Sequence, residues 1–368
     1  MTIFGNTTNV SSMPKVIFNN RNRVFFDSLK TEVDQYFQNH KINKTGNAEL
    51  FIKAAVLIIT AVTIYLSLLF LSMPSVVAIL LCVLLGFVLA SIGFNVMHDA
   101  CHGSFSEKKW VNEIFGLSLN ALGGNAFLWK FKHNILHHSY PNIDGMDDDI
   151  AKSPLMRQAP TQKWVPAHKF QHIYVVLVYA ISSFAWVFIM DFNKYFKQKV
   201  YTSEIHKISL KEHIIFWLSK ALYVLFYILI PVYFVGWNAW MWGFICMHIS
   251  MGLTLALTFQ LAHVVEEAEF QLAGVEPKHI ESEWAAHQVK STSNFAPKNI
   301  FLNWFVGGLN FQVEHHLFPR ISHVHYRHIS PIVRKHCVEN GLPYNQHKTM
   351  SEAIVSHFRL MKHFGSKP

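Results

Sequence analysis

Long apolar runs, separated by short polar turns, dominate the first two thirds of the chain. Residues 54–94 are almost uncharged and are broken only by the segment Ser72-Met73-Pro74-Ser75. A helix needs roughly 20 residues to cross the hydrocarbon core of a bilayer. We therefore expect a hairpin of two membrane spans, at about 54–73 and 75–95.

Three more apolar runs follow, at residues 173–190, 214–235 and 239–262. Histidine-rich segments follow residue 94 and residue 262. If these two segments lie on the same side of the membrane, an even number of crossings must separate them. The runs 214–235 and 239–262 have only Gly236-Trp237-Asn238 between them and form the expected second hairpin. The run 173–190 is then expected to lie at the membrane interface.

The fold class that follows is an all-α integral membrane protein, with four transmembrane helices in two hairpins and a helical cap. The polar turns of the hairpins contain no Lys or Arg, whereas the segments on the histidine-bearing side are basic. The positive-inside rule assigns such a side to the cytoplasm. We expect a cytosolic segment at 1–50, a membrane domain at 51–340 that includes the cap, and a cytosolic tail at 341–368.

The first fifty residues contain one amphipathic pattern. Phe26, Leu29, Val33 and Phe37 recur at helical spacing, with polar residues between them. This pattern predicts a helix with one apolar face and a polar outer face. It lacks the apolar core of a cleaved signal peptide.

Composition supports a membrane protein and narrows its partners. The chain is 51% hydrophobic and 15% charged, with a net charge of +9 that suits anionic lipid headgroups or an acidic protein partner. The long apolar runs argue against nucleic acid as a target. The four cysteines form no C-x-x-C pair, which argues against disulfides and zinc-thiolate sites. The anomaly in the composition is the 23 histidines.

Two clusters of histidines have metal-ligand spacing. His98 and His102 are four residues apart, so on a helix they share one face. His133 and His137 repeat this spacing, and His138 turns about 100° further round the helix. One such pair alone also fits the end of a membrane span, but repetition on one predicted side favours metal binding.

A third cluster and one single histidine extend the set. Gln312 precedes His315 and His316 by one helical turn. His263 lies one residue beyond the last predicted span, at the depth that His98 has in the other hairpin. The eight histidines exceed what one four-coordinate zinc ion uses, so two metal ions are the economical interpretation.

Carboxylates have a minor place in this predicted centre. Soluble di-iron bundles use paired Glu-x-x-His motifs, but here the sole example, Glu276 to His279, contains Pro277 and lacks a twin. Asp99 and Glu314 lie inside the clusters, where each would either orient a ligating imidazole or remain a solvated acid.

The three clusters closely resemble the histidine boxes of the membrane-bound fatty acid desaturases, over roughly residues 50 to 340. Gln312 in place of a histidine resembles the front-end branch of that family, which desaturates between an existing double bond and the carboxyl end. Other shared segments are Trp129-Lys130, Asp147-Asp148-Asp149, Phe259 to His263 and Trp284 to Phe295. The resemblance implies two non-haem iron ions in the cap, O2 as co-substrate, and a narrow acyl tunnel beneath the metals.

The chain departs from the family pattern at two points. No His-Pro-Gly-Gly haem motif of a fused cytochrome b5 domain occurs in the sequence, which implies a separate electron donor, either a ferredoxin or cytochrome b5 with its reductase. It also favours a bacterial inner membrane over the endoplasmic reticulum. Phe259 stands where acyl-CoA members have an iron-binding Asn, so Gln260, Gln312 or water would take that place.

The expected reaction is desaturation of a fatty acyl chain carried by CoA, a carrier protein or a lipid, for example a linoleoyl chain. An unactivated methylene has no acidic proton, so the oxidising power must come from metal and O2. A di-iron lipid hydroxylase on the same scaffold is the alternative enzyme. A histidine-rich metal transporter or membrane cytochrome is the alternative from another class, but its ligands should lie within spans, where His248 is the clear candidate.

Histidines near the C-terminal end are expected to face solvent or lipid headgroups. These are His323, His325, His328 and His336, in a basic stretch.

Overall fold

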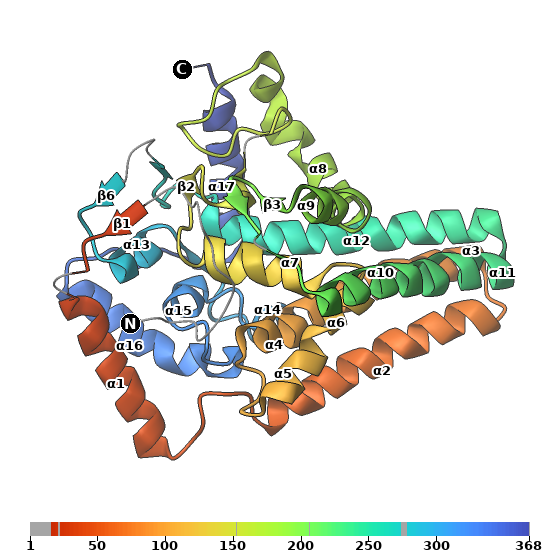
Figure 1. Ribbon diagram of the computed structural model, residues 1–368, viewed down its shortest axis with the longest axis horizontal. Coiled ribbons are helices and arrows are strands. Elements are labelled where there is room, and N and C mark those ends of the chain that lie inside the picture. Colours follow the sequence, from red (N-terminus) through yellow and green to blue (C-terminus); the bar gives the residue numbers. More distant parts are fainter. Residues whose placement is uncertain (1–15, 21–22, 152, 206, 274–277, 368) are drawn as a thin grey trace.

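The structure is a computed structural model that describes residues 16–20, 23–151, 153–205, 207–273 and 278–367. Helices dominate these residues, and the strands are short. Figure 1 shows long helices that extend together to one end of the molecule, while shorter helices and the strands gather at the other end. We call the latter part the cap.

Among the described residues, five continuous helical stretches are long and apolar enough to cross a membrane. They are Ala48–Phe70, Ser75–His102, Pro166–Lys197, Leu210–Val235 and Trp237–His263. Four of them correspond to the four predicted spans, although the first helix ends at Phe70 rather than at residue 73. The remaining one contains the run that was expected at the interface and extends it to 32 residues. The expected count of four spans is therefore not confirmed, because a fifth helix has the length and composition to cross.

The stretches consist of α-helices joined by tighter or wider helical turns. Their elements are α2 (Ala48–Phe70), α3 (Ser75–Ile92), η1 (Gly93–Met97), α4 (His98–His102), η4 (Pro166–Phe170), α8 (Gln171–Ala185), η5 (Trp186–Met190), α9 (Asp191–Lys197), α10 (Leu210–Val224), η6 (Leu225–Leu229), α11 (Ile230–Val235) and α12 (Trp237–His263). Side chains fix some of their starts: Asn47 caps α2 and Ser209 caps α10. The η1, η5 and η6 segments are π-helical turns, which are frequent at functional sites.

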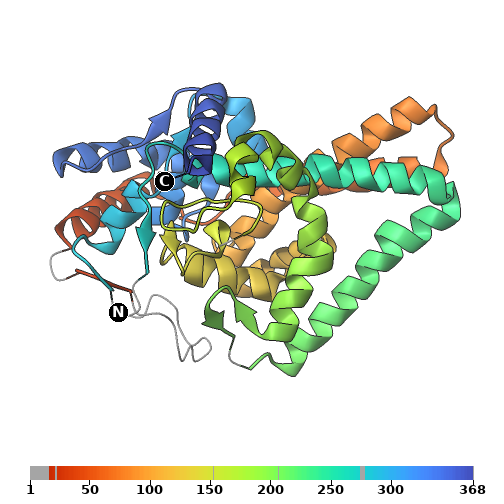
Figure 2. The same ribbon diagram turned by 90° about the horizontal axis from the view of Figure 1, so that it is seen from above.

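Helix α3 lies at the centre of the long helices. It packs against α2 on one side and α12 on the other, and one apolar core joins Leu85 and Leu89 of α3 to Met247 and Met251 of α12. Figure 2 shows α10 and α11 sloping to meet α12 at the end farthest from the cap. The stretch from α3 to α4 and helix α12 therefore both end at the cap, where they carry His98, His102 and His263.

The remaining helices form the cap and the segments next to it. They are α1 (Val24–His40), α5 (Lys109–Gly116), α6 (Ser118–Ala121), α7 (Ala126–Lys130), η2 (Phe131–His137), η3 (Asp148–Ile150), α13 (Trp284–Lys290), α14 (Ile300–Phe305), α15 (Gln312–Leu317), η7 (His323–His325), α16 (Tyr326–Glu339) and α17 (Met350–Gly365). Segments from both ends of the chain thus meet in this part of the molecule, where α1 lies beside α16 (Figure 1).

Short strands pair segments that are far apart in the sequence. The parallel pairs are β1 (Val16–Phe18) with β6 (Lys278–Ile280), β2 (Ile143–Asp144) with β5 (Gln271–Leu272), and β7 (Asn294–Phe295) with β8 (Gln346–His347). One antiparallel pair joins β3 (Lys199–Val200) to β4 (Ser203–Glu204). The pairs tie the cap together without forming a larger sheet.

The amphipathic helix predicted near the N-terminus is confirmed as α1. Leu29, Val33 and Phe37 are buried against α16, as expected, together with Phe25. Phe26 is only partly buried and packs against Phe318 with ring centroids 5.8 Å apart. The apolar face of α1 therefore covers the cap rather than a membrane surface.

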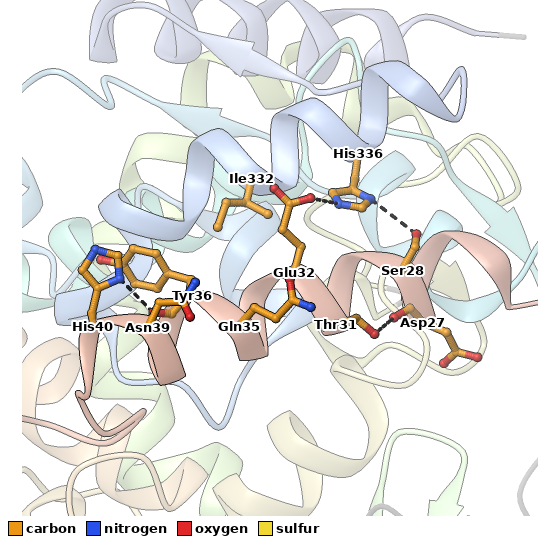
Figure 3. A pocket seen from close by; sticks show the side chains of 10 residues that line it. All are labelled: Asp27, Ser28, Thr31, Glu32, Gln35, Tyr36, Asn39, His40, Ile332 and His336. Atoms are coloured by element: carbon orange, nitrogen blue, oxygen red, sulfur yellow. Dashed lines mark hydrogen bonds and ion pairs between the residues drawn. The ribbon is translucent and has the colours of Figure 1, made fainter.

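A polar groove of about 810 Å³ runs between α1 and α16 (Figure 3). Glu32 in this groove accepts hydrogen bonds from His336, at 2.8 Å, and from Lys335. His323 and His325 are buried as well, and of the four C-terminal histidines His328 alone is exposed. The expectation that all four face solvent or headgroups was therefore wrong: Glu32 of α1 contacts His336, the loop after α1 contacts His325 through Thr45, and Asp99 contacts His323.

Candidate metal centre

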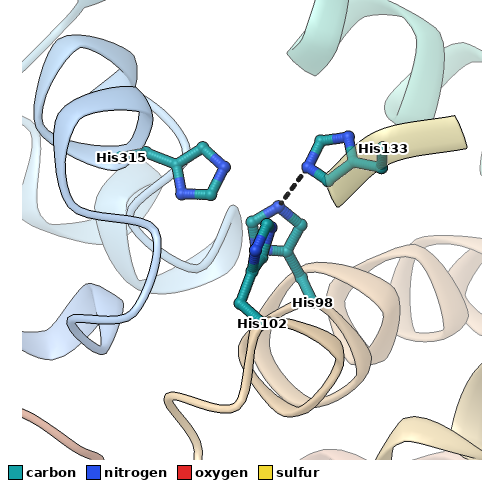
Figure 4. A group of neighbouring side chains, drawn as sticks. All are labelled: His98, His102, His133 and His315. Atoms are coloured by element: carbon teal, nitrogen blue, oxygen red, sulfur yellow. Dashed lines mark hydrogen bonds between the residues drawn. The ribbon is translucent and has the colours of Figure 1, made fainter. Parts of the chain in front are cut away.

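Two groups of histidines meet at the boundary between the long helices and the cap. The first histidine group consists of His98, His102, His133 and His315, and the second consists of His137, His263 and His316. In each group, one nitrogen from every ring lies within 4.8 Å of the corresponding nitrogens of the others. Figure 4 shows the rings of the first group converging from three separate segments, α4, η2 and α15. All these rings were predicted as ligands, His263 from its depth at the end of a span and the others from their spacing.

His138 lies between the two groups. Its Nε2 is 3.2 Å from the Nε2 of His133 in the first group. Its ring centroid is 4.6 Å from that of His315 and 4.4 Å from that of His316. The structure therefore brings all eight predicted histidines into one cluster.

Local structure explains how the first group forms. The helix of α3 continues through the π-helical turn η1 into α4, so His98 and His102 lie on one face at the end of a long rod. The third box reaches them through a tight loop. A Cβ atom on Gly307, where φ is +59°, would lie 2.7 Å from the carbonyl oxygen of Phe94. Glycine at this position therefore lets the loop before α15 approach the first box closely.

The second group is held by residues that follow the boxes. The Asn142 side chain donates to the carbonyl oxygens of His263, at 2.8 Å, and Ser291, at 3.2 Å. His287 donates from Nε2 to the carbonyl oxygen of Pro141 at 2.9 Å. This contact gives His287 a structural role. Helices α12 and α13 are thereby fixed beside the second box.

The ring nitrogens are suited to a metal because several lack any other partner. Nε2 of His102, His315 and His316 is buried and has no hydrogen-bond partner among the residues that the structure describes. Buried polar atoms in native proteins are nearly always paired. Iron accepts neutral imidazole ligands, so the donor set present here fits iron.

Burial also favours the neutral rings that a metal requires. It lowers the pKa of His133, His138, His315 and His316 well below the usual value, and the neighbouring histidines add to this effect. A neutral imidazole presents a lone pair, whereas an imidazolium cannot coordinate. At neutral pH these four rings are therefore ready to bind metal.

Each ring of the second group also meets an oxygen acceptor. The Nδ1 atom of His137 lies 3.1 Å from both oxygens of Asp147 and 3.3 Å from Asp149. His316 donates from Nδ1 to Gln288 Oε1 at 2.8 Å, and His263 donates to the Ser291 carbonyl oxygen at 3.3 Å. A ring that donates from Nδ1 keeps its lone pair on Nε2. These partners therefore set which nitrogen faces the centre.

The acid partners also change the protonation of His137. Burial opposes its charged form, but the carboxylates of Asp147 and Asp149 outweigh this effect, so the pKa of His137 is raised. Asp147 also accepts from the backbone N–H of Asp149 at 3.0 Å. Asp147 thus caps the 3₁₀-helical turn η3 and also contacts a box histidine directly.

The two carboxylates within the boxes point elsewhere. Asp99 accepts from Ser322 Oγ at 2.6 Å and lies 3.0 Å from His323 Nδ1. Glu314 is bonded to Asn294, at 2.8 Å, and to Tyr344, at 2.6 Å. Adjacent residues on a helix diverge by about 100°, so both acids face away from the rings beside them. The described hydrogen bonds to box histidines come from other residues instead.

Gln312 is buried one turn before the last histidine pair, and its Nε2 has no partner within the described residues. Gln260, the other amide considered at the metal, accepts from Gln158 at 2.9 Å and is therefore engaged away from the rings. Phe259 packs between Phe94 and His133, with centroids 6.0 and 6.1 Å away. Glu276, from the single Glu-x-x-His pair, lies outside the described residues.

A narrow apolar slot opens beside the first histidine group. Its walls include Met97, Trp129, Trp186, Leu255 and Phe259. The Trp129 ring stacks on His133 with centroids 4.3 Å apart and an interplanar angle of 24°. A hydrocarbon chain in this slot would have its methylenes next to the histidine cluster.

The fold and this site together define a membrane protein with a buried cluster of histidines that fits metal binding. The profile of the fatty acid desaturase family matches residues 74–348. The chain belongs to the fatty acid desaturase family, and it is an oxidoreductase of lipid metabolism. This membership, together with the buried cluster, favours the desaturase over the transporter and cytochrome interpretations.

Curated relatives cover nearly the whole chain. The chain is 34% identical over 348 residues to an sn-1 linoleoyl-lipid 6-desaturase of Arthrospira platensis, covering 94% of this chain and 93% of that protein. It is 32% identical to the protein of the same name from Synechocystis sp., covering 93% and 96%. It is 33% identical to an acyl-lipid (8-3)-desaturase of Physcomitrium patens, covering 94% and 72%.

Proposed function

We propose that this enzyme is a front-end acyl-lipid desaturase that uses O2 and two external electrons to introduce a cis double bond into an unsaturated, lipid-linked acyl chain. The observation that carries this proposal is the apolar slot directly beside a cluster of buried histidines. Apolar walls select a hydrocarbon chain and exclude water, while the rings supply only metal ligands.

The proposal assigns two non-haem iron ions to the two histidine groups. His98, His102, His133 and His315 would hold one ion, and His137, His263 and His316 the other. His138 lies where it can serve either ion, and Gln312 is the candidate for a further ligand. Together with O2, bound iron supplies the oxidising power that removes hydrogen from an unactivated methylene.

The side chains of the protein would contribute position rather than acid-base chemistry. Trp129 and Phe259 border both the slot and His133, so they hold the reacting methylenes against the rings. Asp147 and Gln288 fix the orientation of His137 and His316. Fixing the reacting atoms in this way converts their reaction into one with a high effective concentration.

The substrate assignment rests on the relatives and on Gln312. The cyanobacterial relatives are named for linoleoyl lipids, and the chain covers almost all of their length. A lipid-linked linoleoyl chain is therefore the proposed substrate, ahead of CoA or carrier-protein esters. Product analysis distinguishes desaturation from hydroxylation and identifies the length of the acyl chain.

We further propose that the cap faces the cytosol of a bacterial inner membrane and receives electrons from a separate carrier, a ferredoxin or cytochrome b5. The basic residues concentrate in the cap and its flanking segments, in keeping with the positive-inside rule. The net charge of +9 would attract an acidic carrier.

The test is to express the chain in a desaturase-poor host supplied with linoleate, and to separate lipid classes before gas chromatography and mass spectrometry. A triunsaturated product should appear first in glycerolipids and vanish in His315→Ala. The matched control is His328→Ala, which removes an exposed histidine of helix α16 outside the histidine cluster. A hydroxylated product, or product in both histidine variants, would contradict the proposal.

A further inference from the structure

A buried ion pair lies within the long apolar helices, away from the histidines. Lys220 Nζ of α10 is 2.9 Å from Asp191 Oδ2 of α9, and both side chains are under one tenth exposed. Both residues belong to stretches that are long and apolar enough to cross a membrane. Ionisable residues in such helices are costly and usually functional. The proposed reaction gives neither residue a role.

The pair binds three neighbouring segments together. Lys220 also donates to the carbonyl oxygens of Gly123, at 2.6 Å, and Val187, at 3.0 Å. Asp191 Oδ1 accepts from Trp186 Nε1 at 3.0 Å. One cation and one anion therefore fix the turn after α6, the π-helical turn η5 and helix α10 relative to one another.

The turn at Gly123 and Gly124 has no room to shift. A Cβ atom on Gly123, where φ is +92°, would lie 2.7 Å from the Tyr223 ring. A Cβ atom on Gly124 would lie 2.8 Å from Leu119 and 3.3 Å from the Trp186 ring. The turn therefore lies so close to the Trp186 ring that a side chain on Gly124 would meet it, and the positions of the turn and the indole depend on each other.

These same segments form one wall of the apolar slot. Gly124, Trp186 and Val187 line the slot together with Trp129 and Phe259, which lie beside His133. The free space is about 20 Å³, which is room for one water-sized or methylene-sized group. A wider apolar cavity of about 500 Å³ shares Leu89 with the slot. The slot is thus a constriction where a small shift of one wall changes which carbon fits.

We propose that Lys220 and Asp191 are positioning residues that select the carbon at which the double bond forms, because they hold Trp186 and the Gly123-Gly124 turn as a fixed wall of the slot. This inference rests on the proposed function and adds the determinant of regioselectivity. Methylenes of an acyl chain are chemically alike, so placement alone distinguishes them.

The first test is Trp186→Phe, which keeps an aromatic ring but removes the hydrogen bond to Asp191. Products are analysed by mass spectrometry of derivatives that locate the double bond. We expect the share of products with a displaced bond to rise about tenfold, since misplacement of reacting atoms by about 1 Å changes rates by up to 100-fold.

The matched control is Trp240→Phe in α12. Trp240 also donates from Nε1 to a backbone carbonyl oxygen, that of Tyr227 at 2.8 Å, but it does not line the slot. The double bond should stay at the wild-type position in this variant. A displaced bond in both variants would show a general loosening of the helices and overturn the proposal.

The second variant is the double substitution Lys220→Met with Asp191→Asn, which leaves no unpaired charge in the helices. A displaced product in this variant is expected as well. If Trp186→Phe forms the double bond at the same carbon as the wild-type enzyme, whatever its yield or thermal stability, the ion pair of Lys220 and Asp191 has only a structural role. This result would overturn the inference. Iron-loaded Trp186→Phe that forms no olefin would also overturn it. Absence of olefin from the wild-type enzyme would instead refute the proposed function.

Discussion

The two histidine groups are held by different means. In the first group, rings pack mainly on other rings: Trp129 stacks on His133, and His315 has the sole described hydrogen bond to an oxygen, from its Nδ1 to the Tyr326 hydroxyl at 2.9 Å. In the second group, all three rings donate to oxygen acceptors, among them the carboxylate of Asp147. Packing therefore orients the first group, whereas hydrogen bonding and charge orient the second.

This difference has a consequence for the metals. A carboxylate behind a ligating imidazole fixes its tautomer and increases its basicity. The first group borders the apolar slot, whereas the contacts of Nδ1 with carboxylate oxygens lie at His137 of the second group. The strongest electrostatic support therefore lies in the second group.

The largest expected effect comes from removing one ring from either group. His102→Ala and His316→Ala should each lower desaturase activity by more than about 100-fold. This loss exceeds the roughly 10- to 100-fold loss that follows removal of a hydrogen-bond partner of a metal ligand. If the two groups hold separate ions, each variant should also retain about one iron ion per chain instead of about two. The measurements are product analysis and metal content of the purified protein.

The outcome also tests the division into two groups. Loss of all iron from both variants would mean that the groups form one interdependent site. His328→Ala, at an exposed position, should keep both its iron and its activity.

The next effect is on the second group alone. Asp147→Asn removes the negative charge next to His137 and should lower iron affinity or activity by about 10- to 100-fold. Asp148→Asn is a matched control, because Asp148 pairs with Lys194 rather than with a box histidine. Chelator competition on the purified protein measures the loss of affinity. Equal losses in the two variants would mean that Asp147 acts through the fold and not through His137.

A smaller effect is expected in the first group. Tyr326→Phe removes one neutral hydrogen bond to His315, which is worth about 1 kcal/mol and corresponds to roughly a fivefold loss of iron affinity. The same chelator competition compares this variant with Asp147→Asn. A larger loss from Tyr326→Phe than from Asp147→Asn would contradict the contrast between the two groups.

The ligands could be predicted from the sequence, but most of their outer partners could not. His98 and His102 share a helix face by spacing alone, a local property that the sequence displays. Tyr326 and Gln288 reach His315 and His316 from other helices, and no periodicity marks such contacts. Asp147 stood out only as part of an aspartate triplet, for which capping is the commoner explanation.

The membrane helices show the same limit. Hydropathy located all the long apolar runs, because it is a property of each segment. Whether the run at 173–190 crosses or lies at the interface depends on its packing against α12 and on its extension to residue 197, and neither is encoded in its own hydropathy. Burial of His323 and His336 likewise depends on distant segments, because His323 meets Asp99 of α4 and His336 meets Glu32 of α1.

The smallest effect is expected far from both groups, in the groove between α1 and α16. Hydrogen bonds from His336 and Lys335 lower the pKa of Glu32, so its folded value lies below its unfolded value. The stabilisation is then fully present above the unfolded pKa and is lost as the pH falls through the folded value. Because this ion pair is partly exposed, Glu32→Gln should cost only about 0.5 kcal/mol near neutral pH. Thermal unfolding at neutral and acidic pH should show this difference shrinking on acidification, while iron content stays unchanged; a loss of iron would instead link the groove to the histidine groups.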